Sequence, residues 1–163
     1  MGSESNSSSS GEGRSTVFNF GENNVTNKIE EHEYDKITNS EGKEEKTPNG
    51  HKYYVSSIHY YYQTIGSHRI IKIGLDCNKC CDGWWLYMDK TRDASKNIDI
   101  SREGLFKYLG SNYHWSRWDY YYDHKNFDYE DCLRLYHNAP SGYSLLLNNC
   151  ADFARYIWNN APY

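Results

Sequence analysis

The architecture is set by the stretch Tyr53-Tyr-Val-Ser-Ser-Ile-His-Tyr-Tyr-Tyr-Gln-Thr-Ile65, followed by Gly66-Ser67 and His68-Arg-Ile-Ile-Lys-Ile-Gly-Leu75. β-Branched and aromatic residues dominate both arms, which is the composition of strands. The Gly-Ser pair between them is typical of a hairpin turn. The segment therefore predicts two antiparallel strands, and Trp84-Trp-Leu-Tyr-Met88 predicts a third strand after a cysteine-rich loop.

Two helices are predicted near the C-terminus. The first begins after Asp128 as N-cap, has Asp131 at its third position, and ends at Pro140-Ser-Gly142. The second spans about residues 150–159 after Asn149 as N-cap, and its apolar stripe consists of Cys150, Phe153, Ala154, Ile157 and Trp158. Together the patterns indicate an α+β fold in which a small antiparallel sheet packs against helices.

The first fifty residues differ in amino-acid composition from the rest of the chain. They are rich in Ser, Asn, Glu, Lys and Gly, and they contain few apolar residues to offset the entropy of ordering. Thr47-Pro-Asn-Gly50 is typical of a break between segments. We therefore predict a disordered tail over residues 1–50, able to contact a protein partner, and a folded domain over residues 51–163.

Composition excludes several function classes. The formal net charge of −4 does not indicate the basic surface that binding of nucleic acid requires. No apolar run reaches the ~18 residues that a membrane span requires, and the N-terminus lacks the apolar core of a signal peptide. The five cysteines are therefore expected to be free thiols in a reducing compartment, which indicates a cytoplasmic protein.

Cys150 is the strongest candidate for a chemical role. At the first position of a helix, unpaired backbone N–H groups and the positive end of the dipole favour a thiolate, which is the reactive form of cysteine. The same N–H groups can receive the oxyanion that forms when a carbonyl is attacked. The alternative is structural, because Cys150 also lies in phase with the apolar stripe of its helix.

The segment Tyr143-Ser-Leu-Leu-Leu-Asn-Asn-Cys150-Ala-Asp-Phe-Ala154 resembles the Asn-Cys-x-x-Phe nucleophile motif of the lecithin:retinol acyltransferase-like group. That group belongs to the permuted NlpC-type papain-like superfamily. The resemblance implies a histidine on the first strand of the sheet, a polar residue on the next strand, and a cysteine that opens a late helix. Ile58-His59-Tyr-Tyr-Tyr62 resembles the strand that carries the base.

The resemblance assigns Cys150 as nucleophile, His59 as base and His68 as the residue that orients the base. The chain departs from the family at two points. The predicted second strand has Lys72 but no histidine in phase, and the usual Asn-Cys-Glu-His-Phe is here Asn-Cys-Ala-Asp-Phe153. For His59 the alternative is a half-exposed strand residue without a chemical role.

The implied chemistry is hydrolysis or acyl transfer through a Cys150 thioester, as in thiol proteases and acyltransferases, and it needs no cofactor. Peptide, isopeptide and lipid acyl substrates all remain open. A second hypothesis is a catalytically inactive interaction domain on the same fold, since the polar set around the nucleophile is incomplete.

The loop Asp76-Cys77-Asn-Lys-Cys80-Cys81-Asp82 contains a Cys-x-x-Cys pair, which is half of a common zinc site. A full site needs two further ligands, and the spacing of His114 and His124 matches no zinc motif. We therefore expect reduced thiols here and no metal, with redox sensing as an alternative, because adjacent thiols oxidise readily.

Overall fold

The computed structural model describes residues 21–80, 83–91, 95–104, 114–141 and 149–163. Its centre is a five-stranded antiparallel sheet in the order β7-β6-β5-β4-β8. The strands are β4 (Tyr53–Gln63), β5 (Arg69–Cys77), β6 (Gly83–Lys90), β7 (Lys96–Ser101) and β8 (Trp115–Tyr121). The α+β class with a small antiparallel sheet is thus confirmed.

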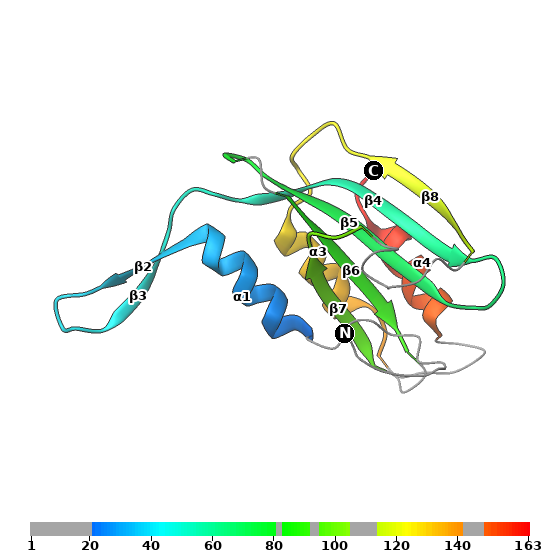
Figure 1. The fold of residues 1–163 in the computed structure, drawn as a ribbon, viewed down its shortest axis with the longest axis horizontal. Coiled ribbons are helices and arrows are strands. Elements are labelled where there is room, and N and C mark those ends of the chain that lie inside the picture. The colour runs from blue at the N-terminus through cyan, green and yellow to red at the C-terminus, as the bar shows by residue number, and fades with distance from the viewer. Residues whose placement is uncertain (1–20, 81–82, 92–94, 105–113, 142–148) are drawn as a thin grey trace.

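Three helices build one core with this sheet: α1 (Gly21–Glu33), α3 (Tyr129–Asn138) and α4 (Cys150–Asn160). α4 packs against β5 and β6, and α1 packs against β7 (Figure 1). The core joins apolar side chains of both layers, among them Ile29, Ile71, Leu86, Phe153 and Ile157. The two predicted C-terminal helices are confirmed, and each begins with a capping box at the expected Asp128 or Asn149.

The N-terminal prediction was wrong for the part of the tail that the structure describes. Residues 21–48 form α1 and a hairpin of β2 (Tyr34–Thr38) and β3 (Glu44–Pro48), which projects away from the main sheet (Figure 1). Val25 and Ile29 are buried in the main core. Two apolar residues one turn apart suffice to dock this helix, so the folded unit includes residues that we had assigned to a disordered segment.

The predicted hairpin and third strand are confirmed as β4, β5 and β6. The edge strands β8 and β7 were not predicted from the sequence. The sequence also predicts a short connector or strand at residues 143–147 and a short helix or loop at residues 101–109. Residues 143–147 and 105–109 lie outside the described residues.

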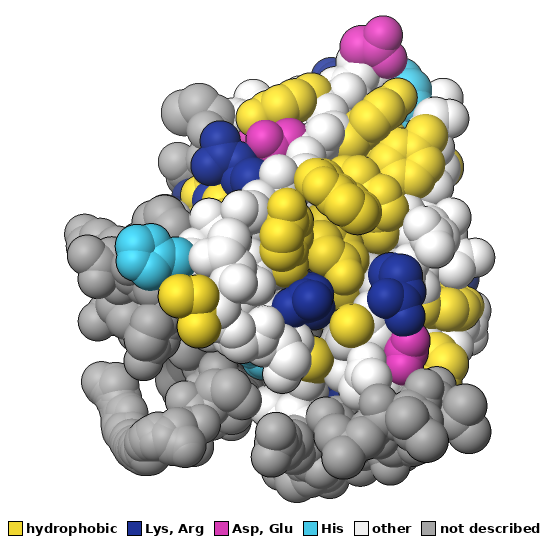
Figure 2. All heavy atoms as spheres, turned by 90° about the vertical axis from the view of Figure 1, so that its right-hand side faces the viewer, with side chains coloured by type: hydrophobic (Ala, Val, Ile, Leu, Met, Phe, Trp, Pro, Cys, Tyr) yellow, Lys and Arg dark blue, Asp and Glu magenta, His cyan; other side chains and the backbone are white. Residues whose placement is uncertain are grey.

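Aromatic rings collect at the β8 edge of the sheet. Trp118 stacks on Tyr60, and Tyr120 contacts Tyr163 edge to face. Figure 2 views this side of the molecule and shows hydrophobic side chains gathered on the surface. The tyrosine run of residues 120–122 thus belongs to the end of β8 and the rim of the sheet.

Candidate active site

Cys150 occupies the first position of α4, as the sequence predicted. The side chain of Asn149 accepts a hydrogen bond from the N–H of Asp152, and the Asp152 carboxylate accepts one from the N–H of Asn149. In this first turn, the N–H groups of Cys150 and Ala151 have no partner within the helix. The local sequence therefore fixes where the helix begins and places the sulfur beside unpaired donors.

The sulfur of Cys150 faces the turn between β4 and β5. Its thiol donates a hydrogen bond to the carbonyl oxygen of Ser67 at 3.0 Å. The next residue, His68, lies near the same sulfur, close enough for the two side chains to influence each other electrostatically. Both Cys150 and His68 are only 9% exposed. If the sulfur loses its proton, the Ser67 contact is lost, and the imidazolium of His68 becomes the group that stabilises the thiolate.

His68 is held by the end of the β4–β5 hairpin. Its N–H donates to Oε1 of Gln63 at 3.1 Å, and its carbonyl accepts from the N–H of Gln63 at 3.2 Å. Its Nε2 forms an ion pair with Oδ2 of Asp89 at 3.0 Å. This ion pair limits the orientations that the His68 ring can take.

Asp89 is the residue that the sequence analysis missed. It lies near the end of β6 with no solvent exposure, and its Oδ1 accepts a hydrogen bond from Nδ2 of Asn97 at 3.0 Å. Asn97 is the residue paired with Asp89 across β6 and β7. The sheet thus supports a chain of contacts from Asn97 to Asp89 and His68, near Cys150.

The electrostatics of this chain favour a charged histidine. Burial disfavours the imidazolium, but the Asp89 carboxylate and the Cys150 sulfur outweigh it and raise the pKa of His68 to about 9. At neutral pH the ring is therefore protonated. A protonated imidazole beside a cysteine is the state that stabilises a thiolate and can later donate a proton.

His59 does not reach Cys150, so the predicted pairing of these two residues was wrong. Nδ1 of His59 contacts Oδ1 of Asp119 at 2.6 Å, and Nε2 contacts the hydroxyl of Ser57 at 2.9 Å. Its strand neighbours Ile58 and Tyr60 belong to the core under the helices. Since side chains alternate along a strand, His59 points away from the helices, and its pairing with Lys72 places it four residues along β5 from His68.

The base and the residue that orients it therefore each lie one strand further along the chain than predicted. His68, predicted to orient the base, is the histidine that lies near the nucleophile, and Asp89 takes the orienting position. A sequence signal for Asp89 exists, because it continues the alternation of Trp85 and Tyr87 directly after the predicted third strand. Neither residue could be chosen from phase alone, because Asp89 and His59 share the sheet face of Trp85 and Tyr87, and only the strand register shows which histidine lies next to Asp89.

The predicted thiol loop lies at the other end of β5. Cys77 and Cys80 are free and lie beside His32 and His51, whose ring nitrogens approach the two sulfurs. His114 and His124, which we had considered as further ligands, are not members of this group. The residues that could hold a metal are thus two cysteines and two N-terminal histidines.

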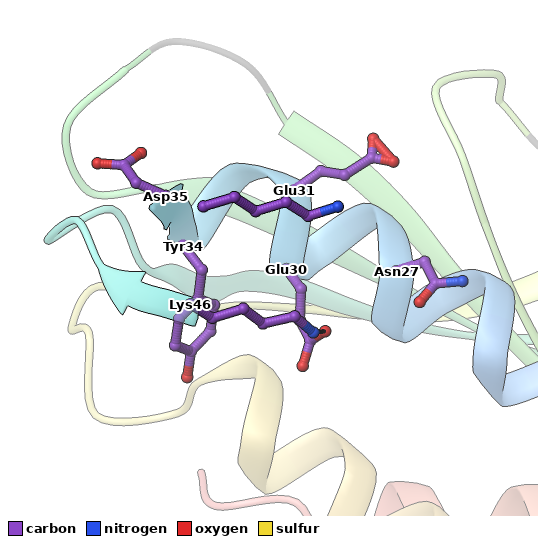
Figure 3. A pocket seen from close by; sticks show the side chains of 7 residues that line it. Asn27, Glu30, Glu31, Tyr34, Asp35 and Lys46 are labelled. Carbon is purple, nitrogen blue, oxygen red and sulfur yellow. Dashed lines mark hydrogen bonds and ion pairs between the residues drawn. The ribbon is translucent and has the colours of Figure 1, made fainter. Parts of the chain in front are cut away.

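A separate cavity of about 850 Å³ lies between α1 and the β2–β3 hairpin. Figure 3 shows its lining, with Glu30 and Lys46 directed toward each other as an ion pair. The described residues that line it include no cysteine or histidine: Asn27, Glu30, Glu31, Tyr34, Asp35, Lys36 and Lys46. This cavity therefore lacks the nucleophile and base of the Cys150 site.

Among the described residues, no helix is both long and apolar enough to cross a membrane. Within the part of the chain that the structure describes, Cys150, His68 and Asp89 form the candidate site for covalent chemistry. No family model, curated protein or solved structure matches the chain.

Proposed function

We propose that the chain is a cysteine-dependent hydrolase or acyltransferase that acts on an ester or amide through a Cys150 thioester. Cys150 is the nucleophile, His68 the general acid and base, and Asp89 the residue that orients and charges His68. The observation that carries the proposal is the ion pair of the buried Asp89 with His68, next to Ser67, whose carbonyl the Cys150 thiol contacts at a helix start. A nucleophile, a base and an orienting group in this relation form the usual constellation of covalent acyl transfer.

The order of these residues supports a permuted papain-like arrangement. His68 precedes one strand, Asp89 lies on the next strand, and Cys150 opens a late helix that packs on both. This is the order that the resemblance to the lecithin:retinol acyltransferase-like group implied, with His68 and Asp89 in place of His59 and His68. We therefore propose a permuted papain-like fold for this chain.

The first step forms the acyl-enzyme. The Cys150 thiolate attacks the carbonyl carbon, a C–S bond forms, and the carbonyl electron pair moves to oxygen. The N–H groups of Cys150 and Ala151 are placed to stabilise that oxyanion. When the tetrahedral intermediate collapses, the C–O or C–N bond breaks and His68 gives its proton to the leaving group.

The second step releases the acyl group. Neutral His68 takes a proton from water, or from an acceptor hydroxyl or amine, as that nucleophile attacks the thioester carbonyl. Collapse expels the Cys150 thiolate and restores the imidazolium, so protons balance over the cycle. Asp89 stays paired with Nε2 throughout and thereby holds the orientation of the His68 ring.

The non-catalytic interaction domain loses its main support. That hypothesis depended on an incomplete polar set around the nucleophile, and Asp89 fills the missing position. The acyl donor is proposed at the level of class, as a peptide, isopeptide or lipid ester or amide.

The test uses p-nitrophenyl acetate as an activated ester. The full chain is mixed with the ester, quenched, and analysed by intact mass and peptide mapping, while p-nitrophenolate release is followed by absorbance. We expect one acetyl group on Cys150. Cys150→Ala should abolish this acylation, and His68→Ala should slow it by about 10²- to 10⁴-fold, the usual contribution of a general acid or base.

His59→Gln is the matched control, because it alters a buried, carboxylate-paired histidine that pairs with Lys72, four residues along β5 from His68. It should acylate within about threefold of the parent rate, by the weak coupling of separated sites. Circular dichroism checks that each variant is folded. Equal p-nitrophenolate release by the parent and Cys150→Ala, or acetyl groups found on other residues only, would refute the proposal.

A further inference from the structure

A second cluster of reactive side chains lies at the far end of β5 from His68. It consists of His32 in the last turn of α1, His51 in the segment before β4, Cys77 at the end of β5, and Cys80 in the following turn. Their four ligand atoms all lie within 4.8 Å of one another. Three separate parts of the chain thus bring two thiols and two imidazoles to one point.

The distances fit a single tetrahedral ion. Nε2 of His32 lies 3.3 Å from the Cys77 sulfur and 3.2 Å from the Cys80 sulfur, and Nδ1 of His51 lies 3.4 Å from the Cys77 sulfur. With Zn–S bonds of about 2.3 Å and Zn–N bonds of about 2.0–2.1 Å, tetrahedral geometry separates the sulfur and nitrogen ligands by about 3.5 Å. The cluster therefore already has nearly the spacing that a bound zinc ion imposes.

The backbone around the cluster is organised as a support for the ligands. The N–H of Lys79 donates to the Cys77 sulfur at 3.4 Å. Asn78 joins the cysteine turn to the His51 segment, since its side chain accepts from the N–H of Lys52 at 2.9 Å and donates to the carbonyl of Gly50 at 3.2 Å. Such hydrogen bonds fix the direction of metal ligands and tune the sulfur.

A matching contact holds the helix end. The Asn49 side chain donates to the carbonyl of His32 at 3.0 Å and accepts from the N–H of His51 at 3.0 Å. One asparagine thus fixes the backbone of both histidines relative to each other. The two rings meet edge to face with centroids 4.7 Å apart, an arrangement that directs one nitrogen of each toward the thiols.

The donor set selects the type of metal. Two thiolates and two imidazoles are soft to intermediate ligands, which suit zinc and disfavour Mg²⁺ and Ca²⁺, which prefer oxygen. Four protein ligands fill a tetrahedral shell and leave no position for water, as in structural zinc sites. Two thiolates also balance the charge of a divalent ion, so the half-buried site stays neutral.

We propose that His32, His51, Cys77 and Cys80 bind one Zn²⁺ ion in a structural site that fastens the end of α1 to the end of β5. The site gives the N-terminal segment a role in the fold and gives the Cys-x-x-Cys pair its two missing ligands. It is independent of the proposed acyl chemistry, because no residue of the Cys150 site takes part.

The first test is the metal content of the full chain, purified without added zinc or chelator and measured by mass spectrometry of the elements. We expect about one zinc per chain. Cys80→Ser and His51→Ala should lower zinc retention at least tenfold, in line with the loss of a direct ligand. Cys81→Ser, which changes the adjacent cysteine of the sequence, is the matched control and should keep the metal.

Cobalt provides a readout that does not require a variant to fold. The parent chain, stripped of metal and titrated with Co²⁺, should show the intense visible bands of a tetrahedral ion and thiolate-to-cobalt charge transfer, saturating at one equivalent. A parent chain without bound metal that gives only a pale octahedral cobalt spectrum refutes the site. Loss of zinc in Cys81→Ser with retention in Cys80→Ser, or a Cys77–Cys80 disulfide in protein purified anaerobically, also refutes it.

Discussion

Two buried histidines of this molecule, His68 and His59, each contact a carboxylate, yet their pKa values move in opposite directions. Burial lowers the pKa of His59 despite the attraction of Asp119, and the nearby cations Lys72 and Arg117 lower it further. Burial acts on His68 in the same sense, but the fully buried Asp89 and the Cys150 sulfur raise its pKa to about 9. His68 is thus the histidine that carries a proton at neutral pH.

This difference leads to a prediction for Asp89→Asn. Replacing the carboxylate by an amide removes a charge that raises the pKa of His68, so that pKa should fall. The imidazolium is the productive form during acylation, and the alkaline limb of the kcat/KM profile with p-nitrophenyl acetate should lie near pH 9 in the parent. In the variant the limb should move to lower pH, with a loss of activity at neutral pH of about tenfold or more.

Asp119→Asn is the control for this pH profile. It removes the carboxylate partner of His59, which does not contact Cys150, so the alkaline limb should stay in place. An alkaline limb that moves in Asp119→Asn and stays fixed in Asp89→Asn would show that the histidine roles are assigned the wrong way round.

At the residue scale the sequence predicted the nucleophile better than its partners. Asn149, Asp152 and the apolar stripe define a helix start within a few residues, and this local pattern was enough to single out Cys150. The base and its partner depend on which residues meet across three separate elements. His68 lies just before a strand and Asp89 near the end of another, so only the pairing of β4, β5 and β6 brings them together.

Among the elements, α1 provides a direct test of where the folded unit begins. Ile29 is 2% exposed in the main core, and Ile29→Ala should lower the free energy of unfolding by about 2–4 kcal/mol, as for other buried large-to-small changes. Urea unfolding of the metal-bound chain measures this loss.

Ile37→Ala in the β2–β3 hairpin is the matched control, because that isoleucine is 46% exposed. It should change the free energy of unfolding by no more than about 0.5 kcal/mol, as is usual for surface substitutions. If the two variants were equally stable, residues 21–33 would not belong to the cooperative fold.

The elements that were predicted correctly have distinct local sequence patterns. The elements that were not predicted lack such patterns and are stabilised by packing or pairing with their neighbours. β4 and β5 are rich in branched and aromatic residues, and α3 and α4 have capping boxes. β7 has only Ile98 and Ile100 as apolar residues and is a strand because it pairs with β6. α1 likewise buries only Val25 and Ile29, too few for a distinct helical pattern.

In the molecule as a whole, β5 connects the two chemical sites. His68 precedes its first residue and Cys77 is its last, a separation of roughly 30 Å at the usual rise per residue. Because the sites lie this far apart, we expect the proposed zinc site to affect the stability of the fold without altering the reactivity of Cys150. The charge-based prediction that the chain lacks a nucleic-acid surface stays a prediction.

Removal of zinc tests this separation. A chelator should lower the thermal midpoint of the full chain and increase hydrogen exchange in α1 and at the end of β5, because the metal joins these segments. At a temperature where the stripped chain remains folded, the acylation rate of Cys150 should stay within about threefold of the metal-bound rate. An unchanged midpoint and exchange pattern would argue against a structural metal, and complete loss of acylation in the folded chain against independent sites.

The most direct test of the Cys150–His68 pair is the rate of Cys150 alkylation by iodoacetamide as a function of pH, read by peptide mapping. In the parent chain, Cys150 should be alkylated readily at pH 6–7, because the charged imidazole of His68 near the sulfur favours its reactive form. In His68→Ala this reactivity should be lost at pH 6–7, and in His59→Gln it should persist. Reactivity that follows an ordinary thiol titration in the parent, or that depends on His59 and not on His68, would contradict the proposed site.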